Sequence, residues 1–209
     1  MRVSKEKATL NRQRILTSAA RLFREHGIEA TGVDSITEDA GLTHGGLYSQ
    51  FGSKEAIAAE AIRFALGRGR SVWQRAVEAN LGKNALPAIV ENYLSRRHRD
   101  APGSGCVVAA LGTDIARQPR RVREAFTRQL KDDLEFLSQL MPDATHADRD
   151  EAAIATFASM AGALILARAV SDATFSDLIL KSTARRVLNC VKARSSRHSR
   201  TQGGSKLGS

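Results

Sequence analysis

Among the polar side chains between residues 43 and 54 are Thr43, His44, Tyr48, Ser49, Gln50 and Lys54. Hydroxyl groups and a lysine ammonium suit phosphate oxygens, and the main-chain amide at a helix N-terminus adds to such binding. A glutamine amide can make two hydrogen bonds to adenine, and an imidazole can donate to a guanine acceptor. The chemistry that these side chains offer is therefore recognition by hydrogen bonds, with a nucleic acid as the natural partner.

The sequence offers no comparable grouping for catalysis or for a metal ion. The five histidines stand singly, with no Glu or second His at metal-ligand spacing. They are His26, His44, His98, His146 and His198. The sequence has no glycine-rich phosphate loop, nucleophile elbow or Cys-x-x-Cys pair. Asp132, Asp133 and Glu135 lie among basic residues and are typical of a solvated helix face. We therefore predict no enzyme activity, no catalytic residue, no metal site and no cofactor.

Two helices must precede the polar group, because apolar residues recur there at helical spacing. The first has an apolar face made of Ile15, Leu16, Ala19, Leu22 and Phe23. Gly27 is a good left-handed end for it. The second helix buries Val33, Ile36 and Ala40, and Asp34 in its first turn complements the helix dipole.

A tight turn and a third short helix then carry the polar residues. Gly41 can adopt positive φ, Leu42 points inward, and the Thr43 hydroxyl caps the next helix. The third helix runs from His44 to about Gln50 and buries Leu47 and Phe51. It leaves outward His44, Gly45, Tyr48 and Ser49, with Gln50 as a further candidate. Gly52 breaks this helix, and Ser53 caps a fourth.

Residues 12–62 resemble the DNA-binding segment of the tetracycline-repressor (TetR) family. The residues that carry the resemblance are Gly27, Thr31, Ile36, Ala40-Gly41-Leu42-Thr43, Gly45, Leu47-Tyr48, Phe51 and Ser53-Lys54-Glu55. It also includes Arg14-Ile15-Leu16, Ala19-Ala20 and Leu22-Phe23 of the first helix. The resemblance implies a transcription regulator whose third helix enters the major groove of double-stranded DNA. It further implies phosphate contacts by Thr31, Thr43, Tyr48 and Lys54.

Two residues depart from the pattern of many family members, which have Lys or Arg at the position of His44 and Ser or Thr at that of Gly46. Gly45 and Gly46 each disfavour a helix by about 1 kcal/mol relative to Ala, but glycine lets a backbone approach DNA closely. Direct reading of bases is then left to His44, Ser49 and Gln50. His44 is the best placed of the three, because the first turn of a recognition helix points into the groove.

From Ser53 to Val191 the apolar pattern is helical throughout, and no segment reads as a strand. The sequence therefore predicts an all-α, nine-helix TetR-like fold. We expect a helix-turn-helix DNA-binding domain at residues 8–54 and a C-terminal ligand-binding and dimerisation domain at residues 55–192. The Ser-, Gly- and Arg-rich end, residues 193–209, is typical of a disordered basic tail.

The family resemblance implies an unknown small-molecule effector held by the C-terminal helices. Candidate lining residues are Trp73, Tyr93, Cys106, Phe126 and Phe157. Core packing is the simpler reading for each of them. The simpler interpretation of Cys106 is a small buried apolar residue, because no cation or His is near it in sequence. The alternative is a redox-sensing thiol.

The last two helices are the predicted interface of a homodimer, because small residues there permit close approach and an apolar stripe follows. The candidate interface residues are Ala155, Ser159, Gly162, Phe175, Leu178, Ile179 and Leu188. The alternative is that both helices are used fully within one subunit. A dimer would set the spacing of two recognition helices and so predict a palindromic operator.

The formal net charge of +10 favours an anionic partner, but the charge is unevenly placed. Residues 1–54 hold nearly as many acidic as basic side chains, whereas every charged residue after Asp177 is basic. The family resemblance implies a repressor that its effector releases from the operator. The alternatives are an activator of the same fold and, because of the basic end, a nonspecific nucleic-acid binder. We predict a cytoplasmic protein with no membrane partner, because the charged N-terminus leads into no apolar segment and residues 152–166 are too short to span.

Overall fold

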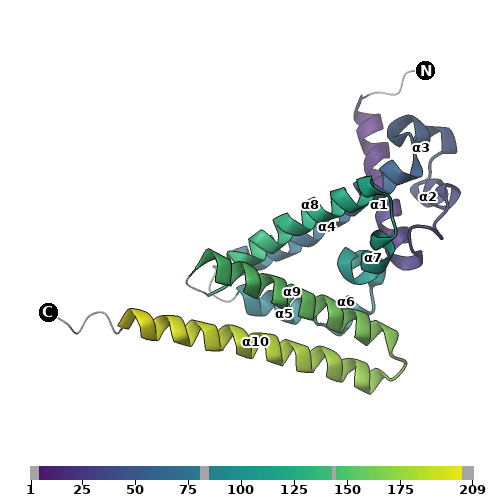
Figure 1. Ribbon diagram of the computed structural model, residues 1–209. Helices are drawn as coiled ribbons and strands as arrows, with labels where there is room; N and C mark the ends of the chain where they lie inside the picture. Colours follow the sequence, from purple (N-terminus) through teal and green to yellow (C-terminus); the bar gives the residue numbers. More distant parts are fainter. Residues whose placement is uncertain (1–4, 81–84, 143–144, 204–209) are drawn as a thin grey trace. The chain divides into compact units, whose positions relative to one another are not determined.

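A computed structural model describes residues 5–80, 85–142 and 145–203 (Figure 1). Over these residues the chain forms ten α-helices and one 3-10 helix, and no strand. This confirms the all-α class. Each of the nine predicted helices is present, and the tenth is a four-residue helix, Arg96–Arg99, in a segment that the apolar pattern left unassigned.

The chain divides into two compact units, and α4 (Lys54–Ala79) and α8 (Arg120–Ser138) each contribute to both. The first unit comprises residues up to Arg70 together with Ala101–Leu130, and the second comprises Ser71–Asp100 and the residues from Lys131 onward. The helix-turn-helix segment predicted at residues 8–54 thus lies in a larger unit that recruits residues far along the sequence.

The first unit contains α1 (Lys5–His26), α2 (Val33–Ala40), α3 (His44–Phe51), a 3-10 turn η1 (Pro102–Ser104) and α7 (Val107–Ala116). The predicted glycine stops are present. Gly27, at φ 88°, follows α1 and donates its amide to the Phe23 carbonyl at 2.8 Å. Gly41, at φ 63°, follows α2 and donates to the Glu38 carbonyl at 2.9 Å. An L-residue with a side chain rarely adopts either backbone conformation.

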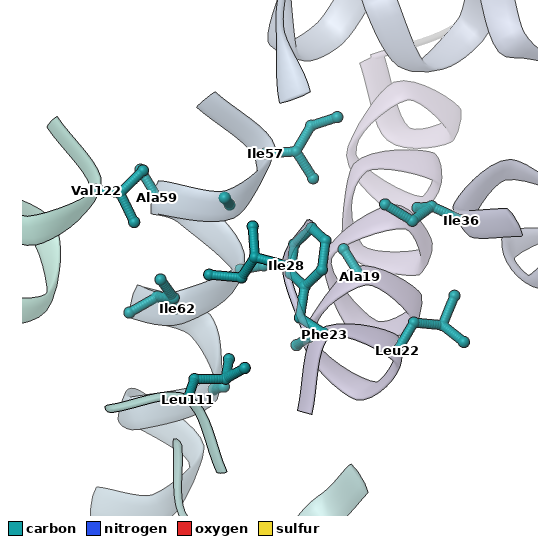
Figure 2. Packing of buried hydrophobic residues seen from close by; sticks show 14 of the residues in the cluster. Ala19, Leu22, Phe23, Ile28, Ile36, Ile57, Ala59, Ile62, Leu111 and Val122 are labelled. Atoms are coloured by element: carbon teal, nitrogen blue, oxygen red, sulfur yellow. The ribbon is translucent and has the colours of Figure 1, made fainter. Parts of the chain in front are cut away.

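The core of the first unit is a single apolar cluster that joins α1, α2 and α3 to α4, α7 and α8. Ile15, Phe23, Ile36, Leu47 and Ile57 are fully buried in it. In Figure 2, Phe23 and Ile28 lie between α1 and the α4 residues Ile57, Ala59 and Ile62, and Ile36, Leu111 and Val122 complete the surround from α2, α7 and α8. The short helices α2 and α3 are too short to be stable alone, so this packing must hold them.

The second unit contains α5 (Ala85–Tyr93), α6 (Arg96–Arg99), α9 (His146–Ala169) and α10 (Ala173–Gly203). The α9 and α10 helices lie side by side, and α10 continues past the end of α9 (Figure 1). At the turn between them the Ser176 hydroxyl donates to the Ala167 carbonyl at 2.6 Å. The Thr145 hydroxyl accepts from the Asp148 amide at 3.1 Å and caps α9, as its position before the helix requires.

Arginine side chains attach α6 to the junction of α9 and α10. Arg96 pairs with Asp177, and Arg99 lies 3.0 Å from the same carboxylate. Arg168 donates to the carbonyls of Arg99 at 3.0 Å and His98 at 2.8 Å. These arginines therefore serve the fold of the second unit, which nothing in their sequence neighbourhood indicated.

Two features of the last helices concern predictions made from composition. The α9 helix is long and apolar enough to cross a membrane by length and composition alone, and Phe157, Met160 and Leu164 are among the α9 residues that are buried inside the second unit. The α10 helix continues to Gly203, whereas composition predicted a disordered tail from residue 193. No Gly or Pro interrupts the sequence from Ser171 to Gln202, so helix propensity is never broken there. Residues 204–209 of that tail lie outside the described residues.

Candidate DNA-binding interface

The α3 helix has one buried and one exposed face, as the sequence pattern predicted. Leu47 is fully buried and Phe51 is 8% exposed, so both anchor the helix in the core of the first unit. The opposite face leaves exposed Thr43, His44, Gly45, Tyr48 and Ser49, while Gly46 and Gln50 are half-buried. The polar side chains that suit phosphates and bases therefore share one solvent-facing surface.

The turn into α3 and the end of α3 are both held by hydrogen bonds. The Leu42 amide donates to the Thr37 carbonyl at 2.8 Å, which closes the turn after α2. Arg12 donates to the Gln50 carbonyl at 3.0 Å, pairs with Glu60, and lies 4.2 Å from the centre of the Phe51 ring. In the structure it ties α1 to the end of α3 and to α4.

Thr43 and His44 stand at the N-terminus of α3. Thr43 is exposed and has extended backbone (φ −90°, ψ 155°), but its hydroxyl makes no hydrogen bond to the helix, so the predicted hydroxyl cap is wrong and the hydroxyl is left for another partner. His44 Nδ1 lies 3.2 Å from Asp34 Oδ1 on α2, and its ring centre lies 5.1 Å from that of Tyr48. A hydroxyl, a helix N-terminus and an imidazole are thus displayed together.

Packing within the protein does not explain why α3 has glycine at positions 45 and 46. A Cβ atom added at Gly45 would meet no heavy atom within 4 Å, and one added at Gly46 would lie 3.5 Å from Thr43 Oγ1, which is ordinary contact. Neither glycine has positive φ. Both positions therefore disfavour the helix without any gain in core packing.

Lys54 and Ser53 begin α4 as the sequence predicted. The Ser53 hydroxyl accepts from the Ala56 amide at 3.1 Å and so caps the helix. Lys54 is half-buried, and its Nζ donates to the Glu29 carbonyl at 3.1 Å, beside the same surface.

Thr31 requires a correction. Its side chain is 3% exposed, and its Oγ1 lies 2.7 Å from the Gly27 carbonyl and 3.3 Å from the Leu22 carbonyl. The hydroxyl thus caps the end of α1. A buried hydroxyl already bound to main-chain carbonyls does not reach a phosphate, so we remove the Thr31 side chain from the predicted contacts.

Residues far along the sequence support the DNA-binding segment by hydrogen bonds that the sequence pattern did not indicate. Asp114 on α7 accepts from the Ile28 amide at 2.8 Å, and Gln118 Nε2 donates to Glu29 Oε1 at 2.8 Å. Arg24 donates through Nε to the Gly103 carbonyl at 2.9 Å, and burial lowers the pKa of Arg24 to about 10, with Arg68 acting in the same direction. These partners are 79 to 89 positions apart in the sequence, so no local pattern could have joined them.

Comparison with known proteins agrees with this geometry. Residues 15–61 match the family described as bacterial regulatory proteins, tetR family, and residues 82–183 match the tetracyclin repressor-like C-terminal domain. The chain belongs to the tetR family.

An uncharacterized HTH-type transcriptional regulator of Mycobacterium tuberculosis is 28% identical over 180 residues, which cover 80% of this chain and 89% of that protein. The HTH-type transcriptional repressor DhaR of a Mycobacterium species is 24% identical over 107 residues, which cover 50% of this chain and 52% of that one. The solved structure of SCO4454, a TetR-family regulator from Streptomyces coelicolor, has a TM-score of 0.73 at 19% identity and covers 90% of this chain and 97% of its own. That structural likeness shows the fold.

Membership in the tetR family makes the chain a transcription regulator with a DNA-binding helix-turn-helix domain, and not an enzyme, as predicted. Over residues 5–80, 85–142 and 145–203, the structure brings together no group of three or more His, Cys, Asp or Glu side chains that could hold a metal ion.

The five residues predicted to line a ligand site in this TetR-family chain separate into two groups. Trp73, Tyr93 and Phe157 form an aromatic cluster in the second unit, with ring centres 5.8 Å apart for Trp73–Phe157 and 6.1 Å for Tyr93–Phe157. Cys106 and Phe126 belong to the first unit. Phe126 packs on the apolar cluster there. Cys106 lies half-buried before α7, close enough to Arg24 for the two side chains to interact electrostatically. A cation is therefore near Cys106 in space, although none is near it in sequence.

The outer face of α9 and α10 carries the residues predicted for the dimer interface. Phe175 and Leu178 are 50% and 53% exposed, Ala155 and Ser159 are exposed, and Ile179 is half-buried. Gly162 and Leu188 are half-buried as well. A groove of about 640 Å³ lies between the two helices. Small side chains line it on α9, among them Ala155, Ser159 and Gly162, and Leu166 and Ile179 add apolar area.

Proposed function

We propose that this TetR-family regulator binds a palindromic DNA operator as a homodimer, represses transcription there, and releases the DNA when a small-molecule effector binds. The exposed polar face of α3 is the observation that carries the proposal. Leu47 and Phe51 fix the helix on the core while Thr43, His44, Tyr48 and Ser49 stay exposed. A rigidly held helix with such a face suits the major groove.

The contacts to DNA divide by chemistry. Thr43, at the N-terminus of α3, presents its hydroxyl and the helix amides to a phosphate. Tyr48 and Lys54 supply a hydroxyl and a cation for further phosphates. His44, Ser49 and Gln50 are the base-reading side chains. Packing within the protein does not require glycine at positions 45 and 46, so we assign Gly45 and Gly46 to a close approach of the α3 backbone to DNA.

Homodimerisation through α9 and α10 is supported by exposed apolar area on both helices. Leu166 and Leu178 are more than half exposed, and Ile154 is 54% exposed. Large apolar side chains exposed on neighbouring helices mark an interaction surface. The small residues along α9 permit a second pair of helices to pack closely, so a two-fold four-helix bundle would cover this face.

Repression and effector response are supported more indirectly. DhaR, a relative of this chain, is named a transcriptional repressor. The Trp73, Tyr93 and Phe157 cluster, with Phe136 stacked on Trp73 at 6.5 Å, is the candidate effector region in residues 55–192. We keep the proposed domain bounds: residues 8–54 form the DNA-binding domain and residues 193–209 form the basic tail. Because its target is DNA, we propose that the regulator acts in the cytoplasm.

Selection from random-sequence duplex DNA tests the proposal, followed by footprinting of the selected sequence with the full chain. We expect a protected palindrome whose two half-sites lie on one face of the DNA duplex. Absence of any enriched sequence would overturn the proposal.

A chain ending at Ala193 separates specific binding from the alternative of nonspecific binding through the basic residues that follow Ala193 in the sequence, which are Arg194, Arg197, Arg200 and Lys206. A regulator keeps its selected site after this truncation, whereas a basic-tail binder loses most of its affinity and of its salt dependence.

A further inference from the structure

We propose that Arg12 is a positioning residue for base recognition, because it fixes the end of α3, and with it Gln50, against α1 and α4. The proposal rests on the proposed function, since it takes α3 to lie in the major groove. Its basis is a single guanidinium that contacts three groups at once. Arg12 donates to the Gln50 carbonyl at 3.0 Å, pairs with Glu60 on α4, and lies 4.2 Å from the centre of the Phe51 ring.

The α3 helix needs support from outside at its C-terminal end. It has only eight residues, and two of them, Gly45 and Gly46, each disfavour a helix by about 1 kcal/mol relative to Ala. The last four carbonyls of a helix have no partner within that helix. Arg12 supplies the donor for the carbonyl of Gln50, in a part-buried contact. Without Arg12 this carbonyl loses its donor, and the last turn of α3 is less firmly held.

Arg12 also bridges the joint between α3 and α4. Only Gly52 and Ser53 separate the two helices. Gly52 has φ 75°, and a Cβ atom added there would meet no heavy atom within 4 Å, so side-chain packing does not hold this joint. Arg12 binds Gln50 before the joint and Glu60 after it. It therefore holds the end of α3 at a fixed place on α4.

Gln50 is the base-reading side chain whose placement depends directly on this support. It lies in the last turn of α3, and its side-chain amide has no hydrogen-bond partner among the described residues, so the amide is available to a base. The Ser49 hydroxyl, in contrast, donates to the Gly46 carbonyl at 3.0 Å. A glutamine makes two hydrogen bonds to adenine only when both polar atoms of its amide meet the base edge. A small shift of the helix end therefore lowers discrimination by Gln50.

A direct contact with a DNA phosphate is the alternative role for Arg12, whose side chain is 37% exposed. The pairing with Glu60 disfavours this role, because the carboxylate neutralises the guanidinium and would repel a phosphate beside it. The two roles differ in what they predict for Glu60→Gln. If Arg12 binds a phosphate, removal of the acid strengthens binding to every DNA sequence. If Arg12 positions α3, removal of the acid weakens discrimination between bases.

The test uses the full chain and its selected operator. Gln50→Ala first identifies the base pair at which Gln50 discriminates. Fluorescence anisotropy then gives the dissociation constants for the selected operator and for an operator in which that pair is exchanged. The ratio of the second constant to the first is the discrimination ratio. It is compared for the unaltered chain, Arg12→Met, Arg12→Lys and Glu60→Gln, each below its melting temperature.

We expect Arg12→Met to lower the discrimination ratio by about fivefold, which is the lower end of the contribution of a bidentate base contact. Arg12→Lys keeps the charge but lacks the planar fork, so it should lower the ratio as well. Glu60→Gln should lower it by about twofold, as expected for loss of one partly exposed ion pair. Arg21→Met is the matched control, because it removes an arginine from the same helix whose partners are Glu25 and Asp39. It should weaken binding to both operators alike and keep the ratio.

An unchanged ratio in Arg12→Met and Glu60→Gln would overturn the proposal, and so would an equal loss of the ratio in Arg21→Met. Tighter binding of Glu60→Gln to both operators, with a salt dependence that falls by about one phosphate contact in Arg12→Met, would instead make Arg12 a phosphate ligand. If Arg12→Met does not fold, Arg12→Lys and Glu60→Gln decide the outcome.

The proposal also fails, while the proposed function stands, if Gln50→Ala relaxes no base pair in a chain that still binds its operator. Failure to select any operator with the unaltered chain would refute the proposed function, and this inference with it.

Discussion

Asp114, on α7, accepts a hydrogen bond from the main-chain amide of Ile28, in the loop after α1, at 2.8 Å. The contact joins a helix from the middle of the chain to the start of the helix-turn-helix. The same carboxylate explains a glycine, because a Cβ atom at Gly27 would lie 2.9 Å from Asp114 Oδ2. The DNA-binding segment is thus supported by residues that lie outside it in sequence.

We expect Asp114→Ala to lower the free energy of unfolding by about 1–3 kcal/mol, because it leaves a partly buried amide without its acceptor. Urea unfolding of the full chain, followed by circular dichroism, measures the change. Glu38→Ala, an exposed acid on α2, is the control and should change stability by less than about 0.5 kcal/mol. Equal stability of the two variants would show that the hydrogen bond between Asp114 and Ile28 does not contribute measurably to the free energy of unfolding.

Gly27→Ala should destabilise the protein by about 1–3 kcal/mol, since alanine is strained at φ 88° and its Cβ would collide with Asp114. In the double variant with Asp114→Ala the collision is gone and only the backbone strain remains. The two losses should therefore add up to more than the loss in the double variant. Strict additivity in the same urea experiment would mean that Asp114 does not confine residue 27.

Gly45→Ala should raise stability by up to about 1 kcal/mol and yet weaken DNA binding. Alanine favours the helix, and its Cβ meets no protein atom, so any loss of affinity must come from the DNA side. Thermal unfolding and anisotropy with the selected operator measure the two effects. Gly69→Ala, which is equally open within α4, is the control for helix propensity and should leave affinity unchanged. Undiminished affinity of Gly45→Ala would show that α3 does not approach DNA at this position.

The second unit should lose stability on mild acidification through His98. Burial lowers the pKa of His98, and Arg168 acts in the same direction, while the hydrogen bond to the Tyr93 carbonyl opposes them. An unfolded histidine titrates near about 6.5, so below that pH the unfolded chain binds a proton that the folded chain does not. The contribution of His98 is thus fully present above about pH 6.5 and is lost as the pH falls through the lower, folded pKa.

His98→Gln should flatten this dependence in urea unfolding between about pH 7.5 and about pH 5. Asp177 and Asp150, whose pKa values are lowered by hydrogen bonds to Arg96 and Ser138 respectively, act at more acidic pH and stay constant in this comparison. A variant with the same slope as the unaltered chain would assign the acid sensitivity to other groups.

Leu166→Glu should convert the proposed dimer to a monomer. Leu166 lines the groove between α9 and α10 and is 56% exposed, so a carboxylate there is solvated in the monomer but would be buried in the dimer. Sedimentation velocity measures the oligomeric state. Ser171→Glu, in the exposed turn after α9, adds the same charge and should remain dimeric. A dimeric Leu166→Glu chain would place the interface elsewhere.

Much of the helix-turn-helix could be predicted from the sequence because its rules are local. Helical spacing of Ile15, Ala19 and Phe23, a glycine at each helix end, and a hydroxyl or small residue before each helix all act over a few positions. The exposed face of α3 followed from the burial of Leu47 and Phe51 for the same reason. The family resemblance strengthened these assignments, and it also suggested a phosphate contact for the Thr31 side chain that burial rules out.

The tertiary structure decided what depends on distant partners. The contact of His44 with Asp34 depends on how α2 and α3 cross. Arg12 can bind the Gln50 carbonyl only because α1 packs against α3. The support of Ile28 by Asp114 joins residues 86 positions apart. Chain connectivity constrains neighbours within a turn of helix, whereas packing of apolar faces selects which distant side chains meet. The helices of this protein and the exposed polar side chains of α3 therefore follow from local sequence. The distant residues that support α3 and pair with its charged groups are determined by the fold.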